Sequence, residues 1–413
     1  MLGWEELRLG SLVSVRKGKL ARLSPTARNG YLPYIGATAL EGRIEAFAET
    51  SGGELATEKD VLMLWDGERS GLVGKGLQGV VGSTVARLTP RDGVDNNFLF
   101  HALSYKFKWI QALRTGTGVP HVPKDLCDIL TIVLPMSIAE QRSIAEILDT
   151  VDEAIQRTEQ LIAKLKAIKQ GLLHDLLTRG LDENGQLRDP IAHPDQFKDT
   201  PLGKIPKEWQ VNPVSSIGVI VTGTTPSGKI KNVWGDHLPF ITPNEITEDG
   251  NIDLAERYLS INGAKFVRLI PHNSILVVCI GSTLGKMAIA DEFCATNQQI
   301  NTIIPNPNYD PYFIYAALVQ FKEQLLRIAG LQAVPIVNKT IFSNISIPIA
   351  SYKEQEKIGD IIKSIKSHIN YEQRYLSKLK LIKKGLMHDL LTGKVRVNIR
   401  EDNYDESKEG ESL

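Results

Sequence analysis

The chain has 413 residues, and its 48 Lys and Arg are balanced by 48 Asp and Glu, so the formal net charge is zero. This balance argues against a small DNA-binding domain, which usually has a strong basic excess, and the length is enough for two or more domains. Three scattered cysteines argue against a disulfide framework or a zinc site. No basic, apolar leader opens the sequence and no apolar run is long enough to cross a membrane, so we expect a cytoplasmic protein.

Two parts of the chain repeat one another. Residues 171–178 (GLLHDLLT) recur 214 positions later as residues 385–392 (GLMHDLLT), with seven of eight positions identical. The same offset carries Glu140-Gln141 onto Glu354-Gln355. Looser matches lie upstream, where residues 32–35 match 238–241, Trp4 matches Trp209, and Gly74-Lys75 matches Gly285-Lys286. Each half is therefore a variable region followed by a better-matched region.

The variable regions predict mixed sheet and helix. Strand-like runs of β-branched and apolar residues stand at 12–15, 61–65, 80–87, 129–134, 217–221, 274–280 and 300–304. Amphipathic helices are predicted near 97–114 and 311–329. Residues 181–205 are rich in Asp, Pro and Gly and predict a linker, and the acidic segment 395–413 predicts a disordered tail.

The matched regions, 139–180 and 351–394, predict two long helices without an internal proline. Apolar residues alternate at spacings of four and three, which is typical of a coiled coil. Gly180 and Gly393 stand where helix C-caps are expected. An ordinary amphipathic surface helix is the alternative. The predicted seam consists of Ile144, Leu148, Val151, Ile155, Ile162, Leu165, Leu172, Leu176, Ile358, Ile362, Ile365, Ile369, Leu376, Leu379, Leu386 and Leu390.

Possible catalytic motifs fail their context tests, so no catalytic residue and no metal site is predicted. Residues 223–229 resemble a phosphate-binding loop, but Ile230 follows where Ser or Thr is required. Residues 281–286 are one position short of that motif, and the GxGxxG of residues 74–79 leads into a strand. The His174-Asp175 and His388-Asp389 pairs lie at helix ends, where packing or a partner contact explains them better than catalysis.

The alternation of variable and helical regions resembles the DNA-specificity subunit of type I restriction–modification systems. Glu140-Gln141 and Glu354-Gln355 open the helices, and the repeated octapeptides close them. Residues 223–226, 281–286 and 297–299 resemble segments of the target-recognition domains in that family. The resemblance implies an α+β fold with a pseudo-twofold repeat. Its target-recognition domains would span 1–138 and 206–350, joined by the two helices as an antiparallel coiled coil.

The resemblance also implies what such a chain does. It would be a non-catalytic subunit whose two domains read a split, asymmetric site in double-stranded DNA. Two modification subunits carrying S-adenosylmethionine would dock on it, and restriction subunits using ATP and Mg²⁺ could then join. The chain itself would hold no cofactor. A coiled-coil scaffold that presents two protein-binding domains is the alternative, and a self-sufficient nucleotide-using enzyme is a third possibility.

Candidate DNA contacts follow from the chemistry of readout, in which Lys and Arg bind phosphates while Arg, Asn and Gln read base edges, helped by Ser and Thr. The candidates are Arg69, Lys75, Ser83, Thr84, Lys124, Thr225, Lys229, Ser282, Thr283, Lys286, Asn297, Gln298, Gln299 and Lys339. A solvated loop residue is the alternative for each. The two variable regions are almost neutral, so we expect much of the affinity for DNA to come from partner subunits.

Overall fold

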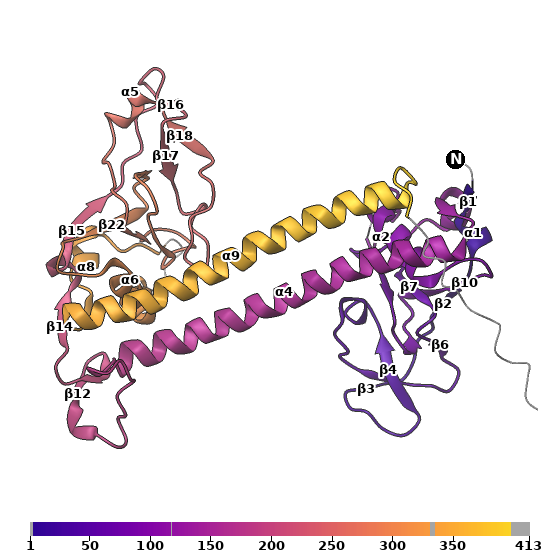
Figure 1. Ribbon diagram of the computed structural model, residues 1–413, viewed down its shortest axis with the longest axis horizontal. Coiled ribbons are helices and arrows are strands. Elements are labelled where there is room, and N and C mark those ends of the chain that lie inside the picture. The colour runs from indigo at the N-terminus through magenta and orange to yellow at the C-terminus, as the bar shows by residue number, and fades with distance from the viewer. Residues whose placement is uncertain (1–2, 117, 331–334, 398–413) are drawn as a thin grey trace, which may run out of the picture. The chain divides into compact units, whose positions relative to one another are not determined.

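A computed structural model describes residues 3–116, 118–330 and 335–397 (Figure 1). The chain divides into two compact units, one of residues 1–159 and 374–413 and the other of residues 160–373. Both long helices pass from one unit into the other, and each unit contains one variable region, here called the first head and the second head. In the part of the chain that the structure describes, no helix combines the length and apolarity needed to span a bilayer.

The first head is built from short strands around one principal helix, and it leads into the first long helix. Its elements are β1 (Trp4–Arg8), α1 (Leu9–Leu12), β2 (Val13–Lys17), β3 (Leu23–Ser24), β4 (Tyr31–Ile35), η1 (Ala39–Glu41), β5 (Phe47–Glu49), β6 (Glu54–Ala56), β7 (Val61–Leu64), β8 (Val73–Lys75), β9 (Gly79–Val81), β10 (Val85–Pro90), α2 (Asn96–Ala112), α3 (Leu126–Ile129), β11 (Thr131–Pro135) and α4 (Ile138–Thr178).

The second head follows a short hairpin and leads into the second long helix. Its elements are η2 (Pro194–Gln196), β12 (Phe197–Thr200), β13 (Gly203–Pro206), β14 (Gln210–Pro213), η3 (Val214–Ser216), β15 (Gly218–Thr222), β16 (Trp234–Gly235), β17 (Leu238–Ile241), β18 (Arg257–Leu259), α5 (Ile261–Ala264), β19 (Ile275–Val278), β20 (Met287–Ile289), β21 (Ala295–Thr296), β22 (Ile300–Pro305), α6 (Pro311–Gln320), α7 (Lys322–Ala329), α8 (Lys339–Ser343), β23 (Ser346–Ile349) and α9 (Tyr352–Leu391).

The two heads share one sheet topology. The order β2-β10-β7-β8 in the first head corresponds to β15-β22-β19-β20 in the second, and these sheets pack on α2 and α6. A second sheet, β3-β5-β4-β9-β6 or β16-β18-β17-β21, contains one parallel pair in each head. We call the part around the first sheet the proximal lobe and the part around the second the distal lobe. The predicted α+β fold with an internal repeat is thereby confirmed.

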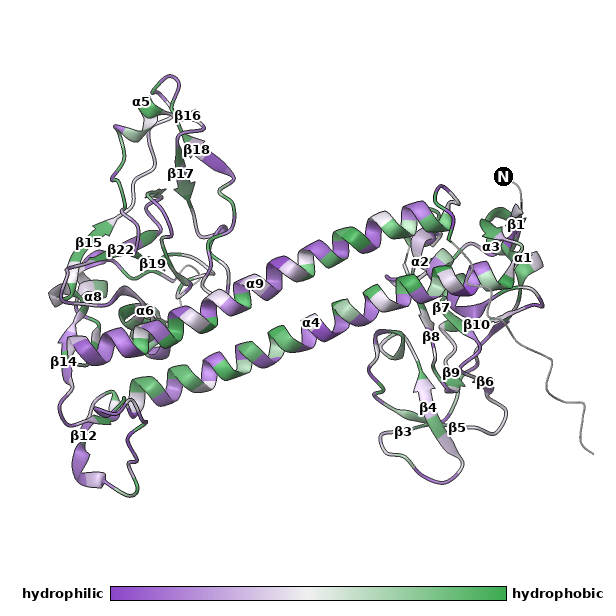
Figure 2. Ribbon diagram, viewed as in Figure 1, coloured by the Kyte–Doolittle hydropathy of each residue, from purple (hydrophilic) through white to green (hydrophobic). Residues whose placement is uncertain are grey.

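Each head is completed by the end of the long helix that belongs to the other repeat. In the first unit, Leu390 and Leu391 of α9 join the core formed by Trp4, Leu9 and Ile144. In the second unit, Leu173, Leu176 and Leu177 of α4 join Trp209, Phe313 and Ile358. The alternating polar and apolar faces of both helices are visible in Figure 2. The seam residues at the helix ends therefore bury their apolar area in head cores, which restricts where each helix can end.

The two long helices run antiparallel within each unit. In the first unit Lys380 pairs with Glu159 at 2.8 Å and Lys383 pairs with Asp152 at 2.5 Å. Residue numbers therefore increase along α9 in the direction in which they decrease along α4. None of the sixteen predicted seam residues is exposed. Ten are buried, namely Ile144, Leu148, Ile162, Leu165, Leu176, Ile358, Ile362, Ile369, Leu379 and Leu390. Gly180 and Gly393 follow the helices with φ of 65° and 71°, the left-handed geometry expected of C-caps.

Several predicted elements have different bounds. Leu12 ends the short helix α1, and Ile129 ends α3, because in each case the apolar residue completes a helical turn before the strand begins. The run 80–87 is two strands separated by a turn, and the helix predicted at 311–329 is broken at Phe321 into α6 and α7. The predicted linker, 181–205, contains strand β12 and most of the hairpin it forms with β13. Of the predicted tail, 395–413, residues 398–413 lie outside the described part.

Candidate nucleic-acid interface

Three loops of the second head are held together by backbone hydrogen bonds. Gly281 N donates to Pro335 O at 3.0 Å, and Val337 N donates to Cys279 O at 2.8 Å. Cys279 N in turn donates to Gln299 O at 2.8 Å. These bonds bring the loop after β19, the turn between β21 and β22, and the segment before α8 to one place.

The first head contains the same bonds between different residues. Gly67 N donates to Pro120 O at 2.8 Å, Val122 N donates to Trp65 O at 2.9 Å, and Trp65 N donates to Thr84 O at 2.7 Å. The three pairs correspond one by one to those of the second head. We call this shared arrangement the loop frame.

A fourth segment joins the loop frame through a glycine in each head. Gly18 N donates to Val85 O at 2.9 Å, and Gly223 N donates to Ile300 O at 3.0 Å. A Cβ at Gly18 would collide with the carbonyl oxygen of Val81, and one at Gly223 with that of Asn297. Only glycine permits this approach without a backbone shift. Gly18 therefore corresponds to Gly223, and residues 18–21 stand where residues 223–226 stand in the second head.

The loop frame corrects one match made from the sequence. Gly71 N donates to Leu64 O at 2.7 Å, and Gly285 N donates to Val278 O at 2.9 Å, so Gly71 corresponds to Gly285. Leu72 consequently corresponds to Lys286, and the pairing of Gly74-Lys75 with Gly285-Lys286 is wrong. The dipeptide Gly-Lys occurs in both heads, but the hydrogen bonds place it at different positions.

The side chains on the frame differ between the heads although the backbone is shared. In the second head Thr225 Oγ1 donates to Gln298 Oε1 at 2.7 Å, and Asn297 Nδ2 donates to Gln299 Oε1 at 2.9 Å. Each glutamine amide is oriented by its neighbour and still has its NH₂ group for another acceptor. In the first head Ser83 and Thr84 take the places of Gln298 and Gln299, as the equivalent turn bonds show.

The loop frame of the first head contains an acidic residue, Asp66, that has two basic partners. Asp66 pairs with Lys17 at 2.6 Å and with His121 at 2.8 Å. Burial opposes ionisation of Asp66, but hydrogen bonds from Lys17 and His121 outweigh it and lower the pKa of this carboxyl group. The corresponding residue in the second head is Ile280, which bridges to Ile336 as Asp66 bridges to His121. The same backbone thus presents charged groups in one head and apolar groups in the other.

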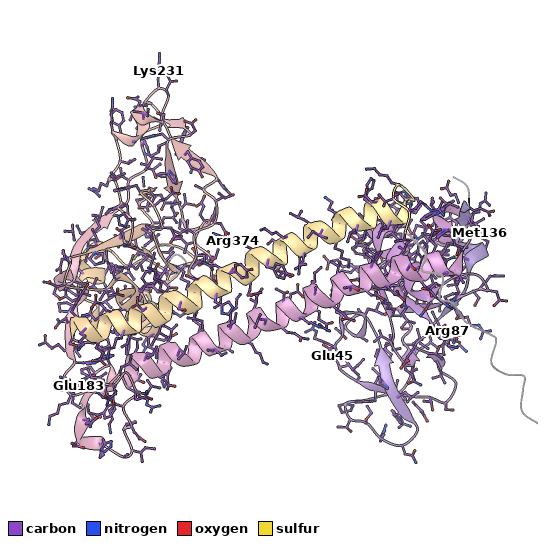
Figure 3. All side chains as sticks on the ribbon, viewed as in Figure 1. Glu45, Arg87, Met136, Glu183, Lys231 and Arg374 are labelled. Atoms are coloured by element: carbon purple, nitrogen blue, oxygen red, sulfur yellow. The ribbon has the colours of Figure 1, made fainter. Side chains whose placement is uncertain are left out.

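Twelve of the fourteen predicted contact residues fall into three groups. Those on the frame of the second head are Thr225, Ser282, Thr283, Asn297, Gln298 and Gln299, and those on the frame of the first head are Arg69, Ser83 and Thr84. Lys124 and Lys339 are exposed on segments next to the frames, and Lys229 is exposed on the segment that leads into the distal lobe. Figure 3 shows Lys231, two residues after Lys229, at the tip of the distal lobe of the second head. Arg69 is paired with Glu41.

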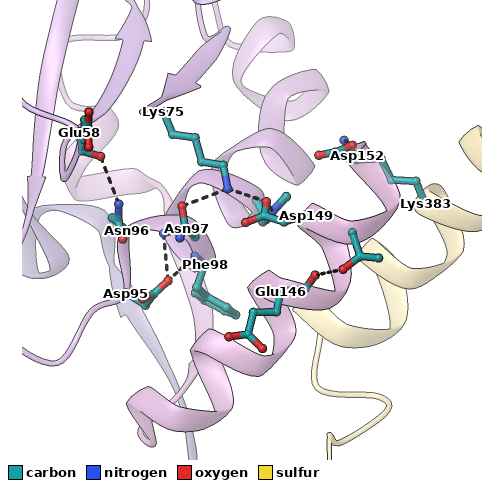
Figure 4. A network of polar contacts seen from close by, with 12 residues as sticks. Glu58, Lys75, Asp95, Asn96, Asn97, Phe98, Glu146, Asp149, Asp152 and Lys383 are labelled. Atoms are coloured by element: carbon teal, nitrogen blue, oxygen red, sulfur yellow. Dashed lines mark hydrogen bonds and ion pairs between the residues drawn. The ribbon is translucent and has the colours of Figure 1, made fainter. Parts of the chain in front are cut away.

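The side chains of Lys75 and Lys286 have acidic partners outside the loop frame. Lys75 Nζ is 2.5 Å from Asp149 of α4 and donates to Asn97 Oδ1 at 3.0 Å (Figure 4). Lys286 pairs with Glu248 at 3.2 Å. The side chain of Lys75 is therefore engaged with the long helix and not with the loop frame, which weakens its assignment as a DNA contact.

A partly buried ion network surrounds Lys75. His101 Nε2 lies 2.7 Å from Asp149, and Lys383 pairs with Asp152 at 2.5 Å (Figure 4). Burial opposes ionisation of Asp149, but hydrogen bonds from His101 and Lys75 prevail and lower its pKa. His101, Asp149 and Asp152 are close enough to hold a metal ion together. Two lysines already neutralise the two carboxylates, so the network is balanced in charge as it stands.

The repeated Glu-Gln pairs are visible in the sequence, but their contacts are visible only in the structure. Glu354 accepts from Trp209 Nε1 at 3.1 Å and pairs with Arg188 at 2.7 Å. Glu140 likewise accepts from Trp4 Nε1 at 3.4 Å and pairs with Arg396 at 2.6 Å. Each arginine follows the long helix of the other repeat, so each Trp-Glu-Arg cluster joins a head to both helices. The matching tryptophans and the repeated glutamates were the sequence signals of these clusters, and no signal marked the arginines.

The glutamines and the helix-end histidines also have structural partners. Gln141 Oε1 accepts from Asp95 N at 2.8 Å, and Gln355 Oε1 accepts from Asp310 N at 3.1 Å, at the start of α2 and α6 respectively. In the first unit, His388 Nδ1 lies 2.9 Å from the Tyr105 hydroxyl. In the second unit, His174 Nδ1 lies 3.3 Å from Gln320 Nε2. Each histidine thus has a polar partner on a helix of a head, which fits the packing role that the sequence offered beside a partner contact.

Comparisons with known proteins agree with this arrangement. A family model described as the type I restriction modification DNA specificity domain matches residues 1–167 and 206–381. The specificity subunit of type I restriction enzyme MjaVIII from Methanocaldococcus jannaschii is 28% identical over an alignment of 419 residues, covering 95% of this chain and 93% of that protein. The HindI specificity subunit from Haemophilus influenzae is 32% identical over 200 residues, covering 46% and 42%.

A solved structure has the same fold. The crystal structure of the S subunit of a type I restriction–modification system from M. genitalium superposes with a TM-score of 0.67 at 19% identity. The superposition covers 94% of this chain and 96% of that one, so it includes both heads and both long helices.

Proposed function

Because the chain belongs to the family of type I restriction–modification DNA specificity subunits, we propose that it selects the DNA sequence on which such a complex acts. Each head reads one half of a bipartite, asymmetric site in double-stranded DNA. The chain contributes no catalytic residue of its own, and it acts in the cytoplasm of a prokaryote.

One observation supports this function most directly. The loop frame has the same hydrogen bonds in both heads, while the side chains at equivalent positions differ, as in Ser83 and Gln298 or Asp66 and Ile280. A shared backbone with interchangeable side chains is what two readers of different base sequences need, since base edges are distinguished by donor and acceptor patterns.

The contacts with DNA fall to the frame side chains and the neighbouring lysines. Gln298 and Gln299 offer amides that suit adenine, and Thr225, Ser282, Thr283, Ser83 and Thr84 offer hydroxyl groups. Arg69, Lys124, Lys229 and Lys339 suit phosphate oxygens. Lys75 and Lys286 are the weakest candidates of the set, because each has an acidic partner and a side chain that is only 23% or 18% exposed, whereas Arg69, which pairs with Glu41, is 46% exposed.

The long helices set the spacing of the two half-sites and dock two modification subunits, after which restriction subunits join. S-adenosylmethionine, ATP and Mg²⁺ belong to those partner subunits. Support for this role comes from the close match of the helices in sequence, since two identical partners require two equivalent docking surfaces.

Sequencing of methylated sites in DNA from cells carrying this chain with its modification subunits tests the function. The expected result is one split site, with two defined halves separated by a fixed number of unspecified base pairs. Methylation of a continuous site, or of no defined site, would contradict it. If the assembled complex ignored DNA sequence altogether, the scaffold alternative with two protein-binding heads would be favoured.

A further inference from the structure

One loop of the second head leaves the distal lobe and reaches both long helices. It comprises residues 247–251, between β17 and β18, and its base is closed by a bridge between Ile246 and Ile252. Asp249 Oδ2 lies 2.6 Å from Lys166 Nζ of α4 and accepts from Gln373 Nε2 of α9 at 3.1 Å. A single carboxylate oxygen thus contacts one residue on each helix.

Further bonds fix the same loop. Lys169 Nζ of α4 donates to the Asp249 carbonyl oxygen at 2.9 Å, and Asn251 Nδ2 donates to Asn370 Oδ1 of α9 at 2.7 Å. Gly250 has a φ of 81°, and a Cβ there would collide with the hydroxyl group of buried Tyr315. The loop therefore has a glycine where it passes over α6, and polar side chains where it meets the helices.

The charges of the helices explain why the loop carries an acid. Lys166, Lys169 and Lys366 gather at this level, and Lys366 lies over the Tyr315 ring at 5.3 Å. Burial disfavours the charged amine of Lys366 and lowers its pKa to about 8, although Asp291 opposes this. Asp249 supplies a negative charge that pairs with Lys166 and favours the charged form of Lys169.

In the first head, the lysine charges on the long helices are neutralised by different residues. The 214-residue offset places Asp152 of α4 where α9 has Lys366, and Asp152 pairs with Lys383. The loop of the first head that corresponds to 247–251 lies between β4 and β5, and its Glu41 pairs with Arg69 of its own head. In the first unit the acid belongs to the helix, and in the second it belongs to the head.

We propose that residues 247–251 form a brace and that Asp249 is a positioning residue, which holds the distal lobe at one angle on the helix pair and thereby restricts the spacing between half-sites. This rests on the proposed reading of a split site. The turn carrying Asn297, Gln298 and Gln299 connects β21 of the distal lobe to β22 of the proximal lobe, so a tilt of the distal lobe would move the reading side chains.

The test compares Asp249→Ala with Asp253→Ala in the complex of the full chain with its modification subunits. Asp253 is an exposed acid four residues along, so its loss changes the net charge equally. DNA substrates carry the wild-type half-sites with the native spacer or with one base pair more or fewer. For Asp249→Ala we expect the preference for the native spacer to fall about tenfold, with both half-site sequences unchanged. Asp253→Ala should retain the wild-type preference.

Lys166→Ala removes the same ion pair from the helix side and leaves the sequence of the loop unchanged. It should weaken the spacer preference in the same direction and by a smaller factor, because Gln373 and the Lys169 bond remain. A wild-type spacer preference in Asp249→Ala and Lys166→Ala would overturn the inference. A wild-type complex without any defined split site would instead overturn the proposed function, so the two failures are distinguishable.

Discussion

The two heads share a backbone and differ in how they are attached to the helices. Their loop frames match bond for bond, and each head has a Trp-Glu-Arg cluster in which the glutamate contacts both other residues. Attachment in the first unit uses an ion network within α4, α9 and β8, whereas the second uses the loop around Asp249. A duplicated fold can therefore keep the backbone geometry of its binding loops while each copy acquires different ion pairs between the head and the long helices.

Substitutions in the two Trp-Glu-Arg clusters should give the largest difference in stability between the two heads. Glu354→Ala should lower the free energy of unfolding by up to roughly 3–5 kcal/mol, because it leaves the largely buried Arg188 guanidinium with only the exposed Glu208, 3.9 Å away, as a counter-charge. Glu140→Ala should cost less, since half of the Arg396 side chain is exposed to water that can replace the carboxylate. Urea unfolding of the full chain measures both.

Glu354→Gln is the matched control, because it retains the shape and one acceptor for Trp209 Nε1. It should fall between the wild type and Glu354→Ala. Equal losses in Glu140→Ala and Glu354→Ala would show that exposure of the arginine does not matter, and the difference drawn between the clusters would be wrong.

A second comparison concerns the frame side chains. Replacing Gln298 and Gln299 with Ala should relax the base preference of one half-site, at about 1–3 kcal/mol for each bidentate pair of hydrogen bonds removed. Replacing Ser83 and Thr84 with Ala should relax only the other half-site, and by less, since a hydroxyl group makes a single contact. Methylation of substrates with each base varied in turn measures the preference. Relaxation of the same half-site by both pairs would contradict separate reading.

We expect a smaller change at Lys366, whose counterpart in α4 is Asp152. The pKa of Lys366 is lowered from 10.5 to about 8 in the folded chain, so between these values the unfolded chain holds a proton that the folded chain has released. Stability should therefore rise with pH across this window, and below it the buried charge is a constant cost. Lys366→Met should stabilise the chain at pH 7 by about 1–3 kcal/mol.

The pH dependence supplies the sharper readout for Lys366. The variant should lack the gain in stability between pH 8 and 10.5 that the wild type shows. Lys363→Met, an exposed lysine one turn earlier on α9, should retain that gain. A wild-type slope in Lys366→Met would mean that this amine is not desolvated in the folded chain.

The sequence was sufficient for the features that periodicity and repetition encode. The heptad pattern located both long helices, none of the sixteen residues it selected is exposed, and Gly180 and Gly393 marked the helix ends, because side-chain spacing and glycine conformation act locally. The match of Trp4 with Trp209 was correct for the same reason, as a large buried residue has few substitutes.

Features that depend on distant backbone contacts could not be predicted. Gly74-Lys75 resembles Gly285-Lys286 in letters, but the frame is defined by main-chain hydrogen bonds, and these place Gly71 opposite Gly285. Glu140 and Arg396 are far apart in the sequence, and no local pattern predicts that they form an ion pair. Asp249 was not a candidate because a single acid in a loop resembles any solvated residue.

The proposed function depends on each head reading its half-site independently of the other. Replacing residues 206–350 with the second head of a relative that reads a different sequence, followed by sequencing of methylated sites, tests this independence most directly. We expect one half-site to change to that of the donor while the other remains unaltered. A change in both half-sites, or in neither, would contradict independent reading.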